Sequence, residues 1–119
     1  MSKDKHQAGY VYILTNRGNS VLYTGATTNL LKRVFQHRQR YLSGFTKRYN
    51  LSKLAYYEVF IDMVSARVRE RKIKGWKRGR KISLIESMNP MWEDLYNGLV
   101  RDPSSLRTQD DPLLIEKTP

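Results

Sequence analysis

The stretch GYVYILTNRGNSVLYTG, residues 9–25, holds two short apolar, aromatic-rich segments on either side of a cluster of turn-forming residues. This pattern predicts a β-hairpin. If the turn is centred between Arg17 and Gly18, Tyr12 faces Tyr23 across the two strands. Such a tyrosine pair has two interpretations: ordinary packing, or two phenols of a catalytic surface.

Composition limits the choice of partner. The chain has 119 residues, enough for one domain with a modest core. It carries 22 Lys and Arg against 11 Asp and Glu, a formal charge of +11. A basic excess of this size favours a polyanionic partner, so we expect DNA, with RNA not excluded.

The same composition excludes several other classes. The chain contains no cysteine, which rules out disulfides, thiolate metal sites and a cysteine nucleophile. No run approaches the roughly 18 apolar residues that a membrane span needs, and the N-terminus lacks the apolar core of a signal peptide. We therefore expect a cytoplasmic monomer that does not bind membranes, with an unidentified protein partner possible for targeting.

The rest of the chain predicts a small α/β (α+β) fold. Thr27 or Thr28 can cap a helix with apolar positions at Leu30, Leu31, Val34, Phe35 and Leu42. Residues 54–60 predict a third strand, Asp62 can cap a helix to about Trp76, and residues 80–88 predict another helix. The expected order is β-β-α-β-α-α, a three-stranded, mostly antiparallel sheet flanked by helices. We expect residues 1–8 to be flexible, 9–97 to form the domain and 98–119 to be a mobile tail.

Glu70 is the most informative single residue. Helical periodicity places it on the inward stripe with Met63, Ala66 and Ile73. From Arg67 to Lys81 the chain has nine basic residues and no acid besides Glu70. A carboxylate kept in such surroundings is either half of a salt bridge or a ligand for a divalent metal ion, and the pattern alone leaves both open.

Arg33 and His37 lie four residues apart and share one face of the first predicted helix. Arginine can bind phosphate oxygens with two hydrogen bonds, and histidine can donate a hydrogen bond or carry a proton near neutral pH. The pair is therefore a candidate phosphate site. Two solvated helix residues remain the simpler reading of the spacing.

Taken together, five segments resemble the GIY-YIG nuclease family, in particular its small single-domain bacterial members related to the excision-repair cleavage subunit. Val11-Tyr12-Ile13 and Tyr23-Thr24-Gly25 stand where the two signature tripeptides fall. The other three segments are the helix with Arg33 and His37, the helix with Glu70, and the closing segment that begins Asn89-Pro90. The resemblance covers roughly residues 9–97.

The resemblance implies a catalytic role for Tyr12, Tyr23, Arg33, His37, Glu70 and Asn89. One tyrosine would sit near the attacking water, Arg33 would clamp the phosphate, and Glu70 would hold a single Mg²⁺ or Mn²⁺. Asn89 would position Glu70 or a water molecule. Many relatives have a lysine directly after the second tripeptide, where this chain has Ala26, so that role would pass to Lys32 or Lys47.

The exposed cations predict how DNA is held. Phosphate contacts of this kind give affinity without sequence information. The predicted DNA-binding residues are Lys32, Lys47, Arg48, Arg67, Arg71, Lys74, Lys77 and Arg78. Three functions follow: a metal-dependent DNA endonuclease, structure-selective and active in DNA repair or processing; a nucleic-acid-binding module of the same fold without turnover; or a scaffold whose basic face binds RNA.

Overall fold

Residues 7–39 and 44–106 are described by the computed structural model. Three antiparallel strands form one sheet in the order β2-β1-β3, with β1 at Gly9–Thr15, β2 at Leu22–Thr27 and β3 at Lys53–Phe60. The helices are α1 (Leu30–Arg38), α2 (Phe45–Arg48), α3 (Met63–Lys74), α4 (Arg78–Met88) and α5 (Tyr96–Arg101), followed by a 3₁₀ turn, Pro103–Leu106. The predicted fold class and element order are confirmed, and the structure adds α2, α5 and this turn.

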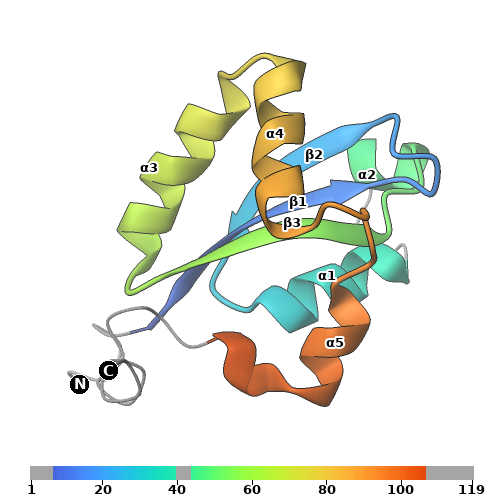
Figure 1. The fold of residues 1–119 in the computed structure, drawn as a ribbon. Coiled ribbons are helices and arrows are strands. Elements are labelled where there is room, and N and C mark those ends of the chain that lie inside the picture. The colour runs from blue at the N-terminus through green and yellow to red at the C-terminus, as the bar shows by residue number, and fades with distance from the viewer. Residues whose placement is uncertain (1–6, 40–43, 107–119) are drawn as a thin grey trace.

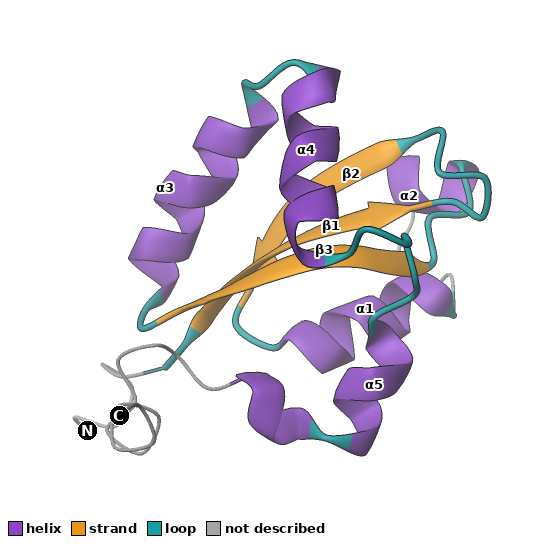
Figure 2. Ribbon diagram, viewed as in Figure 1, coloured by secondary structure: helices purple, strands orange, loops and turns teal. Residues whose placement is uncertain are grey.

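The sheet lies between two helical layers, with α3 and α4 on one face and α1 and α5 on the other (Figures 1 and 2). Strand β1 is central and buried on both faces. Val11 and Ile13 pack with α3 and α4, whereas Tyr12 and Leu14 pack with α1 and α5. The two faces of β1 therefore supply two separate cores.

The register of the hairpin differs from the prediction. Tyr12 lies opposite Gly25, and Tyr23 lies opposite Leu14. The cause is a wider loop, in which the side-chain oxygen of Asn16 accepts hydrogen bonds from the backbone N–H groups of Ser20 and Val21, at 2.8 and 3.1 Å. Because side chains alternate along a strand, the two tyrosines still project from the same face.

Helix capping is partly as predicted. Asn29, not Thr27 or Thr28, is the N-cap of α1, and its side chain accepts a hydrogen bond from the N–H of Lys32. The Thr27 hydroxyl instead accepts from the N–H of Asn29, at 3.1 Å. For α3 the prediction is confirmed, since Asp62 accepts a hydrogen bond from the N–H of Ser65.

Fewer apolar residues of α1 are buried than their helical spacing predicts. Leu30 and Val34 are fully buried, but Phe35 is 43% exposed. Leu42 lies outside the described residues. The short helix α2 follows in the chain, and its side chains contact the hairpin and α1, as described below.

The C-terminal part of the fold includes residues beyond the domain boundary expected at residue 97. Residues 98–106 lie in α5 and the following 3₁₀ turn, and Leu99 is buried in the core beneath α1. The packed chain therefore continues to Leu106. Residues 1–6 and 107–119, which hold most of the predicted flexible termini, lie outside the described residues. In the described part, no helix has both the length and the apolar character to cross a bilayer.

Candidate active site

A chain of three buried polar side chains connects β1 to α1 and α2. The Tyr12 hydroxyl lies 3.3 Å from Nε2 of His37, and Nδ1 of the same imidazole lies 2.9 Å from the Thr46 hydroxyl. All three residues are at most 6% exposed. A neutral imidazole has one N–H and one acceptor nitrogen, so it can take a proton from one neighbour while it donates to the other.

Tyr23 completes a cluster of rings around this chain. Its ring centroid lies 6.3 Å from that of Tyr12 and 5.9 Å from that of His37, and Tyr12 and His37 are 6.0 Å apart. Tyr23 is half-buried, whereas Tyr12 is 1% exposed. The two tyrosines are neighbours, as predicted, although they are not cross-strand partners.

Gly25 makes the position of Tyr12 possible. A Cβ at residue 25 would lie 2.5 Å from the Tyr12 hydroxyl oxygen and 2.6 Å from its Cζ. The phenol therefore lies across the backbone of β2, which is an edge strand of the sheet. The glycine of the second tripeptide is thus explained by the close approach of the tyrosine of the first.

The charges near Tyr12 have opposite effects on the pKa of its phenol. Burial raises the pKa of the Tyr12 phenol most, the neighbouring Tyr23 and Glu70 raise it further, and the charge of Arg33 lowers it. Burial, aided by Arg33, lowers the pKa of His37 to about 4. At neutral pH the pair is therefore a protonated phenol beside a neutral imidazole.

Glu70 approaches from the other face of the sheet. It is 6% exposed and shares its buried stripe on α3 with Ala66 and Ile73, as predicted. Helix α3 passes very close to β1, because a Cβ at Gly9 would lie 2.8 Å from Cα of Met63. From this position the charge of the Glu70 carboxylate raises the pKa of the Tyr12 phenol, with a smaller effect than burial.

Both oxygens of Glu70 are paired with cations. Arg67 lies 3.5 Å from Oε1, and Lys74 lies 2.9 Å from Oε2. The salt bridge that the sequence left open is therefore present. It does not exclude a metal ligand, because both cationic side chains are more than half exposed and can turn toward solvent.

The residues around Glu70 fit a metal ion that keeps most of its water. Among residues 7–39 and 44–106, no group of three or more His, Asp or Glu side chains could enclose a metal. Mg²⁺ is commonly held by only one or two carboxylates, together with water and substrate phosphates. A single buried carboxylate beside exposed arginine and lysine side chains meets the protein's part of that requirement.

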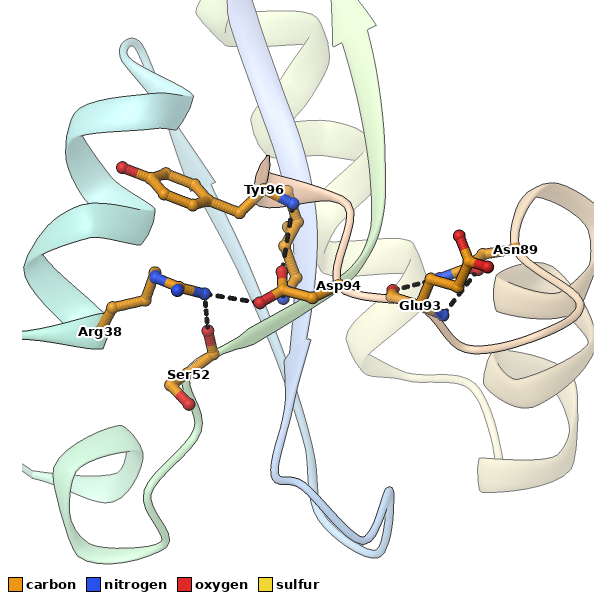
Figure 3. Close-up of polar contacts among 7 residues, drawn as sticks. Arg38, Ser52, Asn89, Glu93, Asp94 and Tyr96 are labelled. Atoms are coloured by element: carbon orange, nitrogen blue, oxygen red, sulfur yellow. Dashed lines mark hydrogen bonds and ion pairs between the residues drawn. The ribbon is translucent and has the colours of Figure 1, made fainter. Parts of the chain in front are cut away.

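Asn89 makes contacts different from those expected. Its amide nitrogen donates to the backbone oxygens of Ala55 and Glu93, at 3.1 and 2.8 Å, and its side-chain oxygen accepts from the N–H of Glu93 at 2.9 Å. Figure 3 shows the Asn89–Glu93 pair of contacts. These bonds fix the turn after α4 to strand β3, so in this structure the amide is engaged by backbone groups.

A second polar group holds the end of α1. Arg38 donates to Asp94 and to the backbone oxygen of Ser52, and its guanidinium lies 4.7 Å from the centre of the Tyr96 ring (Figure 3). Asp94 also accepts from the N–H groups of Leu54 and Tyr96. Because Arg38 follows His37 directly, this group restrains the helix that carries His37.

The predicted DNA-binding residues fall into two regions. Lys32, Lys47 and Arg48 are exposed on α1 and α2, while Arg67, Arg71, Lys74, Lys77 and Arg78 are exposed along α3 and the start of α4. Arg78 also donates to the backbone oxygen of Asn19, at 3.2 Å, and so joins α4 to the hairpin loop. Arg67 and Lys74 are shared with Glu70.

Sequence reasoning missed two residues of this site. Thr46 carries the hydroxyl that contacts His37, and Phe45 stacks on Tyr23 with ring centroids 6.3 Å apart. Both contacts join residues of different elements, which the periodicity of a single helix or strand does not predict. The available signal was the composition of residues 45–49, where two aromatic residues flank two cations.

A comparison with known protein families identifies the class to which this chain belongs. The family model described as the GIY-YIG catalytic domain matches residues 8–83, and the chain belongs to the GIY-YIG family of nucleases. The predicted resemblance is therefore confirmed.

Several relatives are proteins of the UPF0213 group. One from Clostridium perfringens is 41% identical over 78 residues, which is 66% of this chain and 83% of the relative. Another from Staphylococcus haemolyticus is 39% identical over 77 residues, 65% of this chain and 93% of the relative. The solution NMR structure of a UPF0213 protein from Bacillus halodurans is similar at a TM-score of 0.48 and 26% identity, covering 73% of this chain and 92% of that one.

Proposed function

We propose that this protein is a divalent-metal-dependent DNA endonuclease that hydrolyses phosphodiester bonds. One observation carries the proposal: the buried Tyr12 hydroxyl contacts Nε2 of the buried His37 at 3.3 Å, and the charges of Arg33 and of the buried Glu70 both act on the pKa of this phenol. The strong positive charge of the chain supports a nucleic acid as the substrate.

Each group has a chemical task in hydrolysis. Arg33 binds the nonbridging oxygens of the phosphate and offsets their charge. The Tyr12 oxygen accepts a proton from the attacking water while its own proton passes to Nε2 of His37, and the Thr46 hydroxyl accepts the N–H at Nδ1. The bound phosphodiester favours this transfer, because its negative charge counteracts the effect by which Arg33 lowers the pKa of His37.

Glu70 would hold the metal ion. When bound, Mg²⁺ or Mn²⁺ supplies positive charge at the scissile phosphate and at the departing oxygen. Lys74 and Arg67, which pair with Glu70 in the protein alone, then become available for DNA phosphates. Lys47, next to Thr46 in the chain, is our candidate to replace the lysine absent at Ala26. The role proposed for this activity is structure-selective cleavage in DNA repair or processing.

A nicking assay tests the proposal. Supercoiled plasmid and branched duplexes are incubated with Mg²⁺, Mn²⁺ or chelator, using wild type, Arg33→Ala and Glu70→Gln. Nicking should require metal, and each variant should lose at least about a hundredfold in rate with little loss of DNA binding. Titration of Mn²⁺ should broaden NMR signals around Glu70 in the wild type and not in Glu70→Gln.

A DNA-binding module without turnover is the second candidate. Two observations favour it: the ion pairs that occupy Glu70, and Ala26 at the position where many relatives have lysine. Wild-type protein that binds these DNAs and cuts none of them, or Glu70→Gln that cuts as fast as wild type, would replace the nuclease proposal with this one.

A further inference from the structure

A row of three aromatic rings leads from the candidate active site to the protein surface. Tyr23 packs against His37, Phe45 stacks on Tyr23 with an interplanar angle of 28°, and Tyr49 lies 4.7 Å from Phe45. The two outer rings are more exposed than the inner one, since Phe45 is 48% and Tyr49 40% exposed while Tyr23 is half-buried. The two outer rings project from α2 and its C-cap, four residues apart.

Packing within the two hydrophobic cores does not account for the exposed faces of these two rings. Phe45 and Tyr49 belong to neither hydrophobic core, although both cores recruit partly buried residues from the surrounding elements. Helix α2 is held against α1 by Thr46, which is buried and forms a hydrogen bond with His37. The outer rings therefore add exposed aromatic area without contributing to either core, which is typical of a binding surface.

The charges around the rings indicate the partner. Lys47 and Arg48 are exposed between Phe45 and Tyr49, and the Arg48 guanidinium lies 5.6 Å from the centre of the Tyr49 ring. Aromatic rings that alternate with cations bind single-stranded nucleic acid, because bases stack on the rings while phosphates meet the cations. In a duplex the faces of the bases are already stacked and cannot reach such rings.

We propose that Phe45 and Tyr49 form a stacking platform for unpaired bases of single-stranded or branched DNA. The platform selects substrates with unpaired bases beside the cleaved phosphate, because its inner end meets Tyr23 and His37. This substrate class rests on the proposed endonuclease function, whereas base stacking itself does not depend on cleavage. Base stacking thus gives a function to the aromatic side chains of α2 and its C-cap, which take no part in the proposed hydrolysis.

The test measures binding in the absence of metal. A single-stranded DNA oligonucleotide containing 2-aminopurine, and a duplex of the same sequence, are titrated with wild type, the Phe45→Leu and Tyr49→Leu double variant, and the control Val64→Ala. Val64 is 74% exposed on α3, outside this aromatic row. Leucine preserves apolar character and removes the aromatic face.

Stacking predicts quenched 2-aminopurine fluorescence with wild type and Val64→Ala, and loss of this quenching in the double variant. The double variant should bind the single strand about tenfold more weakly or worse. Its duplex affinity should stay within twofold of wild type. Circular dichroism and thermal unfolding measure whether the double variant is folded.

Four results would overturn the proposal: no quenching with wild type, equal loss of single-strand and duplex binding, an RNA strand bound more tightly with the same quenching, or a concentration-dependent dimer abolished by the double variant. Quenching without nicking would refute the nuclease function alone. Nicking without quenching would refute the stacking platform alone.

Discussion

Tyr12 and Tyr56 are both buried, and burial raises the pKa of both phenols, but their surroundings differ. Tyr56, on β3, donates to Glu58, whose two oxygens each accept a hydrogen bond from Arg69 at 2.9 Å. Tyr12, on β1, contacts the neutral imidazole of His37. One phenol therefore belongs to a paired set of charges, and the other to a chain of neutral groups.

The two networks differ in how they can respond to a bound phosphate. The Arg69 guanidinium also lies 5.2 Å from the centre of the Trp76 ring, so the Tyr56 network joins β3 to α3 and the segment after it. Its carboxylate already has a counter-charge, which leaves it little response to an added anion. Within residues 7–39 and 44–106, no carboxylate is hydrogen-bonded to the Tyr12 network, so a bound phosphate can change its proton positions.

The largest expected effect comes from removing each phenolic hydroxyl in turn. Tyr12→Phe should slow nicking by about a hundredfold or more, because a proton acceptor at the attacking water is lost. Tyr56→Phe should leave the rate within threefold of wild type and lower thermal stability. Rates normalised to folded protein check both variants, and equal losses in the two would remove the contrast between the regions.

Gly25→Ala tests the close approach that positions Tyr12. The added methyl group would meet the buried phenol at 2.5 Å, so we expect a loss of about 2–3 kcal/mol in the free energy of unfolding. The matched control is Gly79→Ala in α4, where a Cβ meets nothing within 4 Å. That change should stabilise the helix by about 0.5–1 kcal/mol. Denaturant unfolding measures both, and an unaffected Gly25→Ala would contradict the packing described.

The buried His37 predicts a pH dependence of stability. Its pKa in the folded protein is about 4, against 6.5 for an ordinary histidine, so between these values the unfolded chain binds the extra proton. Stability should therefore fall as the pH is lowered from 6.5 toward 4, by about 2 kcal/mol at pH 5. His37→Gln should lose this dependence, as measured by urea unfolding at pH 5 and 7.5. A wild-type protein equally stable at both values would show that the imidazole is solvated.

Local patterns in the sequence predicted the fold well. Helical periodicity placed Glu70 on the buried face of α3, and Asp62 caps that helix as expected. Both results depend on residues within one or two turns of each other, where backbone geometry leaves few alternatives.

Side-chain contacts that lie outside a single helix or strand could not be predicted in this way. The hairpin register depends on the Asn16 side chain, which widens the loop and shifts every cross-strand pair. Thr46 bonds to His37, and Asn89 to the backbone of Ala55, across segments whose approach is set by the whole fold. Periodicity gives the face that a residue occupies and not the partner it meets there.

The smallest expected effect is on DNA affinity, and it concerns two arginines on α3. One of them is paired with a carboxylate, and the other is not. Arg69 is held by Glu58, whereas Arg71 is exposed and has no ion pair within residues 7–39 and 44–106. An arginine free to contact phosphate releases counterions when DNA binds. Arg71→Gln should therefore weaken duplex binding about two- to threefold and reduce the slope of log affinity against log salt by about 0.9. Arg69→Gln should leave that slope unchanged and lower thermal stability instead, because it removes the partner of a half-buried carboxylate. Fluorescence anisotropy between about 50 and 200 mM salt measures the slopes, and equal slopes for wild type and Arg71→Gln would remove Arg71 from the DNA-binding surface.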